Sequence, residues 1–100
     1  MKTLFIVRHA KSSWKNNNLS DFERPLTRRG HLAAPFMAKR LKEKGETFDL
    51  ILTSPANRTF STAQYFATEF DYDHEHIEEA HSIYLADYGT ILTIIDNMPN

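Results

Sequence analysis

The 100-residue chain is 41% hydrophobic and 25% charged, with a net charge of -1, as is ordinary for a globular protein. This length predicts a single domain, and the charge balance argues against general nucleic-acid binding, which needs a basic excess. The absence of cysteine excludes disulfides, thiolate catalysis and cysteine-ligated zinc. The N-terminal apolar run is too short for a signal peptide or a membrane span, so we expect a cytoplasmic protein without membrane contact.

The first predicted element is a strand at residues 3–7. The run Leu4-Phe5-Ile6-Val7 is short and rich in strand-forming residues, which is typical of a strand buried on both faces. Arg8 and His9 follow at once. Ligands of α/β sheets bind beyond the carboxyl ends of strands, so this pair is either a functional site or simply a polar strand end.

Residues 10–26 are predicted to form an irregular loop, because serine and asparagine in this stretch favour turns. Loops of this length inside a compact domain are often functional. Trp14 either anchors the loop on the domain or belongs to the core.

The apolar residues between 27 and 44 recur at helical spacing and predict a helix. Thr27 is a suitable N-cap, and Gly45 is a suitable helix stop. Pro35 interrupts the pattern. We expect it to kink the helix or to divide it into a short first turn and a main helix from about Ala34.

Residues 48–53 predict a second strand, and the Ser54-Pro55 pair that follows predicts the start of a helix that runs to about Phe70. Arg58 falls in the first turn of that helix. The predicted buried residues are Leu50, Ile51 and Leu52 in the strand and Ala63, Phe66, Ala67 and Phe70 in the helix.

Residues 71–82 are acidic and rich in histidine, with a possible short strand near His76-Ile77. A last helix is predicted to begin near Asp87–Gly89 and to include Ile95. The alternation of strands and helices predicts an α/β fold with a mostly parallel sheet and right-handed crossovers.

The two strand ends together suggest a phosphate site. If the strands are neighbours, one crevice holds Arg8, His9, Arg58 and a helix N-terminus. Guanidinium groups bind phosphate oxygens bidentately, and a helix N-terminus adds N–H donors. Lys11 either adds charge or is solvated. A neutral His9 imidazole is a competent nucleophile toward phosphorus, while no single carboxylate stands out as the proton donor.

Four stretches of the sequence form recognisable motifs: Val7-Arg8-His9-Ala10-Lys11-Ser12-Ser13-Trp14, residues 21–30 (DFERPLTRRG), Ala34-Pro35-Phe36-Met37 and residues 54–63 (SPANRTFSTA). Together they resemble the histidine phosphatase (phosphoglycerate mutase-like) superfamily, and in particular its small SixA-type phosphohistidine phosphatases. The resemblance implies a three-layer α/β/α fold and a phosphatase that acts on phosphohistidine in a protein. It implies that His9 is the phosphorylated nucleophile and that Arg8 and Arg58 bind phosphate. We also expect Lys11 and Ser12 to contact the substrate. The resemblance further implies a site with neither metal nor cofactor.

Two features depart from the family pattern. The family pocket contains a second histidine, in a Gly-His motif after a later strand, and the sequence ends at Asn100 before such a strand. The Gly30-His31 pair falls in the helix entry, so we interpret His31 as an ordinary exposed histidine. We therefore expect residues 1–100 to be the N-terminal part of one histidine phosphatase-like domain, inactive alone. The other departure concerns the proton donor, which is an acidic residue in the family. The nearest matching stretch of this sequence has His81 instead, with Glu78 and Glu79 just upstream.

Three alternatives remain open. His74 and His76 would face the same side of a strand and could bind a metal, although no third ligand is evident. The chain could be a non-catalytic module that binds phosphate or a phosphoprotein. As a phosphatase, it could instead act on a small phosphorylated metabolite.

Overall fold

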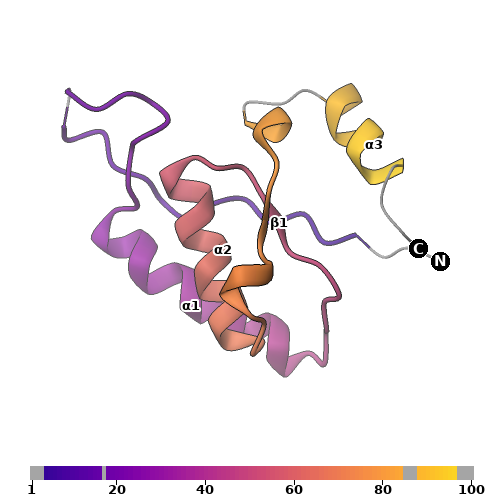
Figure 1. Ribbon diagram of the computed structural model, residues 1–100. Coiled ribbons are helices and arrows are strands. Elements are labelled where there is room, and N and C mark those ends of the chain that lie inside the picture. The colour runs from indigo at the N-terminus through magenta and orange to yellow at the C-terminus, as the bar shows by residue number, and fades with distance from the viewer. Residues whose placement is uncertain (1–3, 17, 85–87, 97–100) are drawn as a thin grey trace.

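The computed structural model describes residues 4–16, 18–84 and 88–96. Within these residues, helices alternate with a small parallel sheet, which confirms the predicted α/β class (Figure 1). The two strands pair with Leu52 opposite Glu78 and Thr53 opposite Glu79. The elements in chain order are α1 (Arg28–Glu43), β1 (Leu52–Thr53), α2 (Asn57–Glu69), the 3₁₀ helix η1 (His74–His76), β2 (Glu78–Glu79), the 3₁₀ helix η2 (His81–Ile83) and α3 (Tyr88–Asp96).

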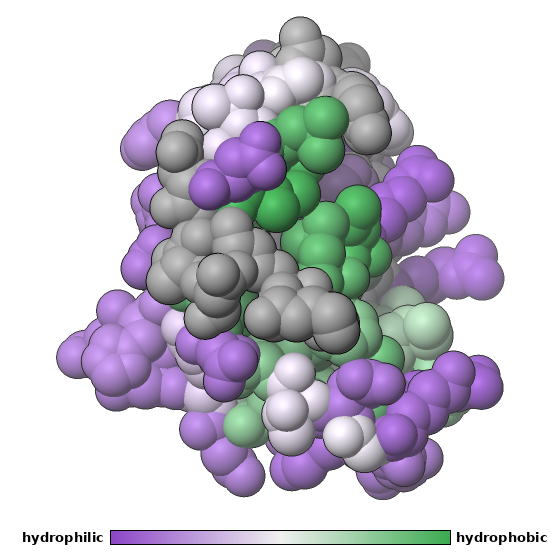
Figure 2. Space-filling view, turned by 90° about the vertical axis from the view of Figure 1, so that its right-hand side faces the viewer, coloured by the Kyte–Doolittle hydropathy of each residue, from purple (hydrophilic) through white to green (hydrophobic). Residues whose placement is uncertain are grey.

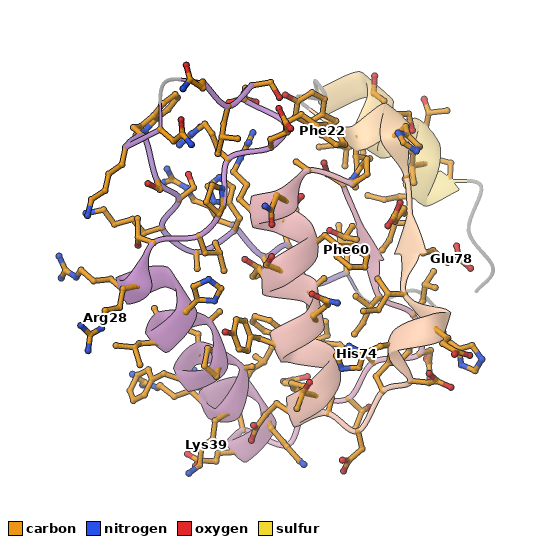
Figure 3. All side chains as sticks on the ribbon, turned by 60° about the vertical axis from the view of Figure 1, so that its left-hand side comes forward. Phe22, Arg28, Lys39, Phe60, His74 and Glu78 are labelled. Carbon is orange, nitrogen blue, oxygen red and sulfur yellow. The ribbon has the colours of Figure 1, made fainter. Side chains whose placement is uncertain are left out.

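The helices lie in layers about the strands. Helix α2 packs between α1 and the two strands, and α3 lies beyond the strands, away from α1 and α2 (Figure 1). Phe60 points from α2 toward the strands, whereas Arg28 and Lys39 point outward from α1 (Figure 3). The core between α2 and the sheet contains Ala63, Ala67 and Ile77, with Ile51, Phe60 and Tyr72 packed against them.

Helix α1 begins and ends where the sequence predicts. The Thr27 hydroxyl accepts a hydrogen bond from the Gly30 amide at 3.0 Å, which satisfies one of the unpaired N–H groups of the first turn. Gly45 follows the helix with φ of 84°, a conformation that favours glycine. The helix is continuous through Pro35, so the predicted division there is wrong. Ala34 and Ala38 are buried on either side of the proline, and this packing holds the helix together.

The predicted first strand is not formed. Residues 4–10 carry no strand pairing among the described residues, and Ile6 is 81% exposed, so the prediction of a strand buried on both faces is wrong here. A strand requires a neighbour that accepts and donates its backbone hydrogen bonds, and among the described residues β1 pairs with β2 alone: the Glu78 amide donates to the Ile51 carbonyl at 3.0 Å. Phe5 instead makes an edge contact with Phe48, with ring centres 5.2 Å apart.

The predicted second strand and second helix are both shorter than expected. Strand β1 covers only two of the residues 48–53. Helix α2 begins three residues after Ser54, because the Ser54 hydroxyl accepts from the Ala56 amide at 3.3 Å and so forms a turn ahead of the helix. The predicted inner face of α2 is confirmed for Ala63, Phe66 and Ala67, which are buried, while Phe70 is half-buried.

The segment after α2 differs from its predicted form. His74 and His76 lie in the 3₁₀ helix η1, not on a strand, and the strand begins after Ile77. The Asp73 carboxylate caps η1 by accepting from the Glu75 amide at 2.9 Å, which favours the helical turn. Helix α3 confirms the predicted last helix, although the expected start at Asp87 lies outside the described residues.

Apolar residues gather on one face of the molecule, with hydrophilic residues on either side and below (Figure 2). Large apolar residues that are exposed include Leu4, Ile6, Val7, Ile91 and Leu92. In the part of the chain that the structure describes, no helix has the length and apolar character needed to cross a membrane.

Candidate active site

A hollow of about 530 Å³ lies where the segment that carries Arg8 and His9 meets the start of α2. This volume is typical of small-molecule sites. The hollow brings together five of the predicted site residues, and among the described residues its lining contains no carboxylate. Its lining residues are Arg8, His9, Ala10, Lys11, Ser12, Trp14, Arg24 and Arg58.

The His9 ring is oriented by the backbone of the next residue. Its Nδ1 lies 2.7 Å from the Ala10 carbonyl oxygen, and because a carbonyl can only accept, Nδ1 carries the proton in this contact. The proton-free Nε2 of the neutral ring keeps its lone pair. The Ala10 amide donates to the Thr62 hydroxyl at 3.1 Å, and this hydroxyl donates to the Arg58 carbonyl at 2.8 Å. The His9 segment is therefore fixed to α2.

Arg58 occupies the first turn of α2 and is only 6% exposed. Its guanidinium donates twice to Asp21, from Nη1 to the backbone carbonyl at 2.6 Å and from Nη2 to Oδ2 at 3.0 Å. One of the N–H donors expected at this helix start has a protein partner, because the Asn57 amide donates to the Phe22 carbonyl at 3.0 Å. Arg58 thus reaches the hollow in an orientation that the loop residue Asp21 sets.

Arg24 is a site residue that the sequence reasoning did not single out. It lines the hollow, is 7% exposed, and donates from Nη2 to the Ser12 hydroxyl at 2.6 Å. It also donates from Nη1 to Asp21 Oδ1 at 3.1 Å and from Nε to the Ser13 carbonyl at 3.0 Å. The sequence signal that could have identified Arg24 is its position inside the long loop, three residues after an aspartate.

The carboxylate of Asp21 joins both arginines to the segment after β2. Tyr84 donates to Oδ2 at 2.5 Å. This hydrogen bond and the one from Arg58 stabilise the charged form and lower the Asp21 pKa from 3.8 to about 2. The same hydrogen bond raises the Tyr84 pKa. Asp21 is therefore ionised at neutral pH and offsets part of the charge of Arg24 and Arg58.

The loop that carries these groups is closed at its base. Ser12 and Leu26 form an antiparallel bridge, and the Thr27 amide donates to the Lys11 carbonyl at 2.7 Å. Gly30 permits this closure, since a Cβ at that position would lie 2.3 Å from the Lys11 carbonyl oxygen. The Lys11 side chain is exposed at the rim of the hollow.

The two predicted acid–base candidates do not line the hollow. Glu79 ends β2 and His81 begins η2, both exposed. The carboxyl ends of parallel strands share one edge of the sheet, so these residues follow the same edge as the start of α2. Tyr84, at the end of η2, reaches the site through Asp21.

The other histidines lie elsewhere. His31 is exposed and contacts the Tyr65 hydroxyl at 2.7 Å, and His74 contacts the Thr68 hydroxyl at 2.9 Å. Among residues 4–16, 18–84 and 88–96, no three histidine, aspartate or glutamate side chains are grouped as metal ligands.

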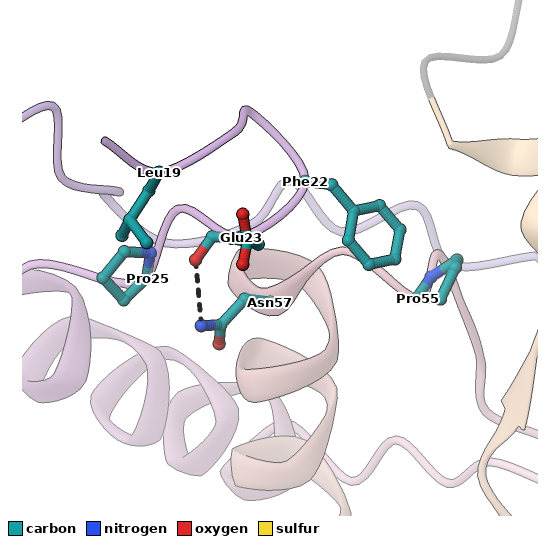
Figure 4. A pocket seen from close by; sticks show the side chains of 6 residues that line it. All are labelled: Leu19, Phe22, Glu23, Pro25, Pro55 and Asn57. Carbon is teal, nitrogen blue, oxygen red and sulfur yellow. Dashed lines mark hydrogen bonds between the residues drawn. The ribbon is translucent and has the colours of Figure 1, made fainter. Parts of the chain in front are cut away.

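A second hollow of about 410 Å³ lies beside the loop (Figure 4). Its wall includes Phe22 and Pro55, and the Asn57 side chain donates to the Glu23 carbonyl across it at 3.2 Å. Phe22 also makes an edge contact with Tyr84, with ring centres 5.2 Å apart. This hollow is mainly apolar and lacks the cations of the first.

Comparison with known proteins agrees with this architecture. The profile of the Histidine phosphatase superfamily (branch 1) matches residues 4–93. The protein from Agrobacterium tumefaciens assigned as phosphohistidine phosphatase SixA superimposes with a TM-score of 0.82 at 30% identity, covering 92% of this chain and 58% of that one. A protein histidine phosphatase SixA solved with tungstate shares the fold, with a TM-score of 0.75 at 23% identity, over 87% of this chain and 55% of that one.

Curated relatives include a 2,3-bisphosphoglycerate-dependent phosphoglycerate mutase from Bartonella tribocorum, 41% identical over 66 residues. That match covers 64% of this chain and 32% of the relative. An uncharacterized chloroplastic protein from Arabidopsis thaliana is 37% identical over 70 residues, covering 70% of this chain and 32% of that one. The chain thus spans about a third of these curated relatives. It belongs to the histidine phosphatase superfamily, branch 1.

Proposed function

We propose that this chain carries the nucleophile and phosphate-binding half of a phosphatase that works through a phosphohistidine intermediate on His9. The observation that carries the proposal is the orientation of His9, whose Nδ1 donates to the Ala10 carbonyl in a hollow lined by four cationic side chains. This arrangement leaves Nε2 as the nucleophilic atom beside a site for an anion.

Phosphate binding is assigned to the arginines, with Lys11 and Ser12 as further contacts. Arg8 and Lys11 form no ion pair within the described residues, so their charge is available to an anion. Arg24 and Arg58 are buried and preoriented by Asp21. Since, among the described residues, Asp21 pairs with only two of the four cations and no carboxylate lines the hollow, the hollow favours a doubly charged phosphoryl group.

The reaction divides into two transfers. Nε2 of His9 attacks phosphorus, the bond to the leaving group breaks, and the arginines stabilise the charge on the equatorial oxygens. A proton donor neutralises the leaving atom, and we assign this role to His81 or Glu79 on the strength of their place at the same sheet edge as α2. Water then attacks the phosphohistidine, which releases phosphate and restores His9.

The favoured substrate is phosphohistidine in a protein. The likeness to the Agrobacterium SixA protein supports this choice. A second candidate is a small phosphorylated metabolite, favoured by the identity with bisphosphoglycerate-dependent mutases. Residues 1–100 would in either case form part of a single domain.

The test is to trap phosphate on His9 in the full-length protein. Incubation with radiolabelled substrate and rapid acid-free quenching should give a label that survives base and is lost in acid, as a phosphoramidate is. His9→Ala should abolish the label. His31→Ala is the matched control, because His31 is exposed and contacts Tyr65 away from the hollow. A label that persists in His9→Ala contradicts the proposal.

Phosphohistidine and small phosphomonoesters are then compared by kcat/KM. Preference for phosphohistidine supports the protein substrate, and preference for a phosphomonoester supports the metabolite.

A further inference from the structure

Trp14 is the only tryptophan of the chain, and it is 73% exposed while lining the same hollow as His9 and the arginines. Tryptophan is highly buried on average, because its large apolar ring gains much from removal from water. The exposure overturns the core interpretation of Trp14 and leaves an indole at the wall of the candidate active site.

The indole is held in place by a buried cation. Arg24 Cζ lies 3.1 Å from the centre of the Trp14 ring. Arg24 is itself fixed by hydrogen bonds to Ser12, Ser13 and Asp21. A ring stacked on a fixed guanidinium has little freedom left, so a ligand that contacts Trp14 loses little side-chain entropy.

The position of Trp14 relates it to the group that carries the phosphate. The hollow, at about 530 Å³, is large enough to hold a phosphoryl group at Arg8 and Arg58 and to leave space for what is attached to it. Because Arg24 covers part of the indole and the side chain is still mostly exposed, apolar ring surface remains open to a ligand. A flat ring gains offset-stacked or edge contact with an indole, whereas a flexible alkyl chain gains less.

We propose that Trp14 forms a stacking subsite for the planar ring of the phosphorylated group, of the imidazole or aryl class. This inference rests on the proposed function, since it takes the phosphate to bind at Arg8 and Arg58. The Trp14 subsite favours substrates whose phosphorus is attached to a ring over substrates whose phosphorus is attached to an alkyl chain.

Binding of non-hydrolysable probes tests the subsite. Calorimetry on the full-length protein compares phenylphosphonate with propylphosphonate, which share the anionic head. We expect wild type to prefer the phenyl probe by about threefold to tenfold, the range that one aromatic pair supplies. Trp14→Leu should remove the preference while propylphosphonate still binds, which also shows that the variant is folded. Trp14→Phe should retain most of it.

A matched control is Phe36→Leu, which removes an aromatic ring that is 60% exposed on α1, outside the lining of the hollow. It should leave the preference unchanged. Equal affinities in wild type, or a preference that survives in Trp14→Leu, would overturn the subsite and leave the phosphate site standing. Failure of wild type to bind either phosphonate would overturn the phosphate site and the subsite together.

A kinetic arm compares phosphoimidazole with phosphoramidate, both of which carry a phosphorus–nitrogen bond. In each, water replaces the nitrogen on phosphorus, and the nitrogen leaves with a proton. Trp14→Leu should lower kcat/KM for phosphoimidazole by about threefold to tenfold and leave phosphoramidate nearly unchanged. A parallel loss on both substrates would mean that Trp14 serves only to shape the loop, and would contradict the subsite.

Discussion

Arg58 donates two hydrogen bonds to Asp21, one to its backbone carbonyl at 2.6 Å and one to its carboxylate at 3.0 Å. The two residues are 37 positions apart, so this contact fixes the long loop to the first turn of α2. Tyr84 and Arg24 bond the same carboxylate. One side chain therefore orients both buried arginines of the candidate active site.

Asp21→Asn should impair substrate binding without removing any phosphate ligand. The amide no longer pairs with both guanidinium groups, so Arg24 and Arg58 lose their fixed orientation, and we expect kcat/KM to fall by about tenfold to a hundredfold, mainly through KM. Steady-state kinetics on the full-length protein measures this. Asp49→Asn, at an exposed carboxylate outside the site, is the control. Unchanged kinetics in Asp21→Asn would rule out the orienting role.

Asp21 should contribute to the pH dependence of the free energy of unfolding. Its pKa is lowered to about 2 in the folded chain from an ordinary 3.8, so its contribution is complete above about pH 4 and is lost as pH falls toward 2. Asp21→Asn should therefore flatten the fall in unfolding free energy between these values, and Tyr84→Phe should flatten it in part. Urea unfolding at several acidic pH values measures the slope. An identical slope in wild type and Asp21→Asn would contradict the assignment.

Gly30→Ala should destabilise the fold by about 1–3 kcal/mol, because the new Cβ would lie 2.3 Å from the Lys11 carbonyl and one element must move. The His9 segment would shift with Lys11, so activity should fall as well. Gly45→Ala is the contrast: φ there is 84° with open space around it, so it should cost about 1–2 kcal/mol from backbone strain alone and spare activity. Thermal unfolding of both variants measures the loss of stability, and steady-state kinetics measures the change in activity. Loss of activity in both, or in neither, would mean that Gly30 does not position the site.

The dependence of kcat on the leaving group should identify the proton donor. If His81 or Glu79 protonates the leaving atom, then His81→Ala or Glu79→Gln should lower kcat for a poor leaving group by about a hundredfold or more. The same variant should have little effect on an aryl phosphate whose leaving group needs no proton. Equal effects on both substrates, or none on either, would remove that residue from the role. Glu78→Gln, one residue upstream on β2, is the control.

The helices were predictable because their signals are local. The Thr27 cap, the Gly45 stop and the spacing of Ala63, Phe66 and Ala67 act within a few residues, and the structure confirms each of them. Strand predictions were weaker, because a strand exists only where a neighbour pairs with it. Residues 4–7 have the composition of a strand but no partner among the described residues, whereas Glu78–Glu79, which look like surface, pair with β1.

Three features of the site are properties of short stretches and can be read from the sequence: the family motifs, the adjacency of Arg8 and His9, and the place of Arg58 at the start of a helix. Three others depend on the folded arrangement: Arg24 joins the site, Asp21 holds both buried arginines, and Trp14 stands exposed on Arg24. Asp21 joins the loop to α2 through Arg58 and to the segment after β2 through Tyr84. The spacing of Asp21 and Arg24 is local, but Arg58 and Tyr84 reach Asp21 only where distant segments meet, and no local pattern encodes that meeting.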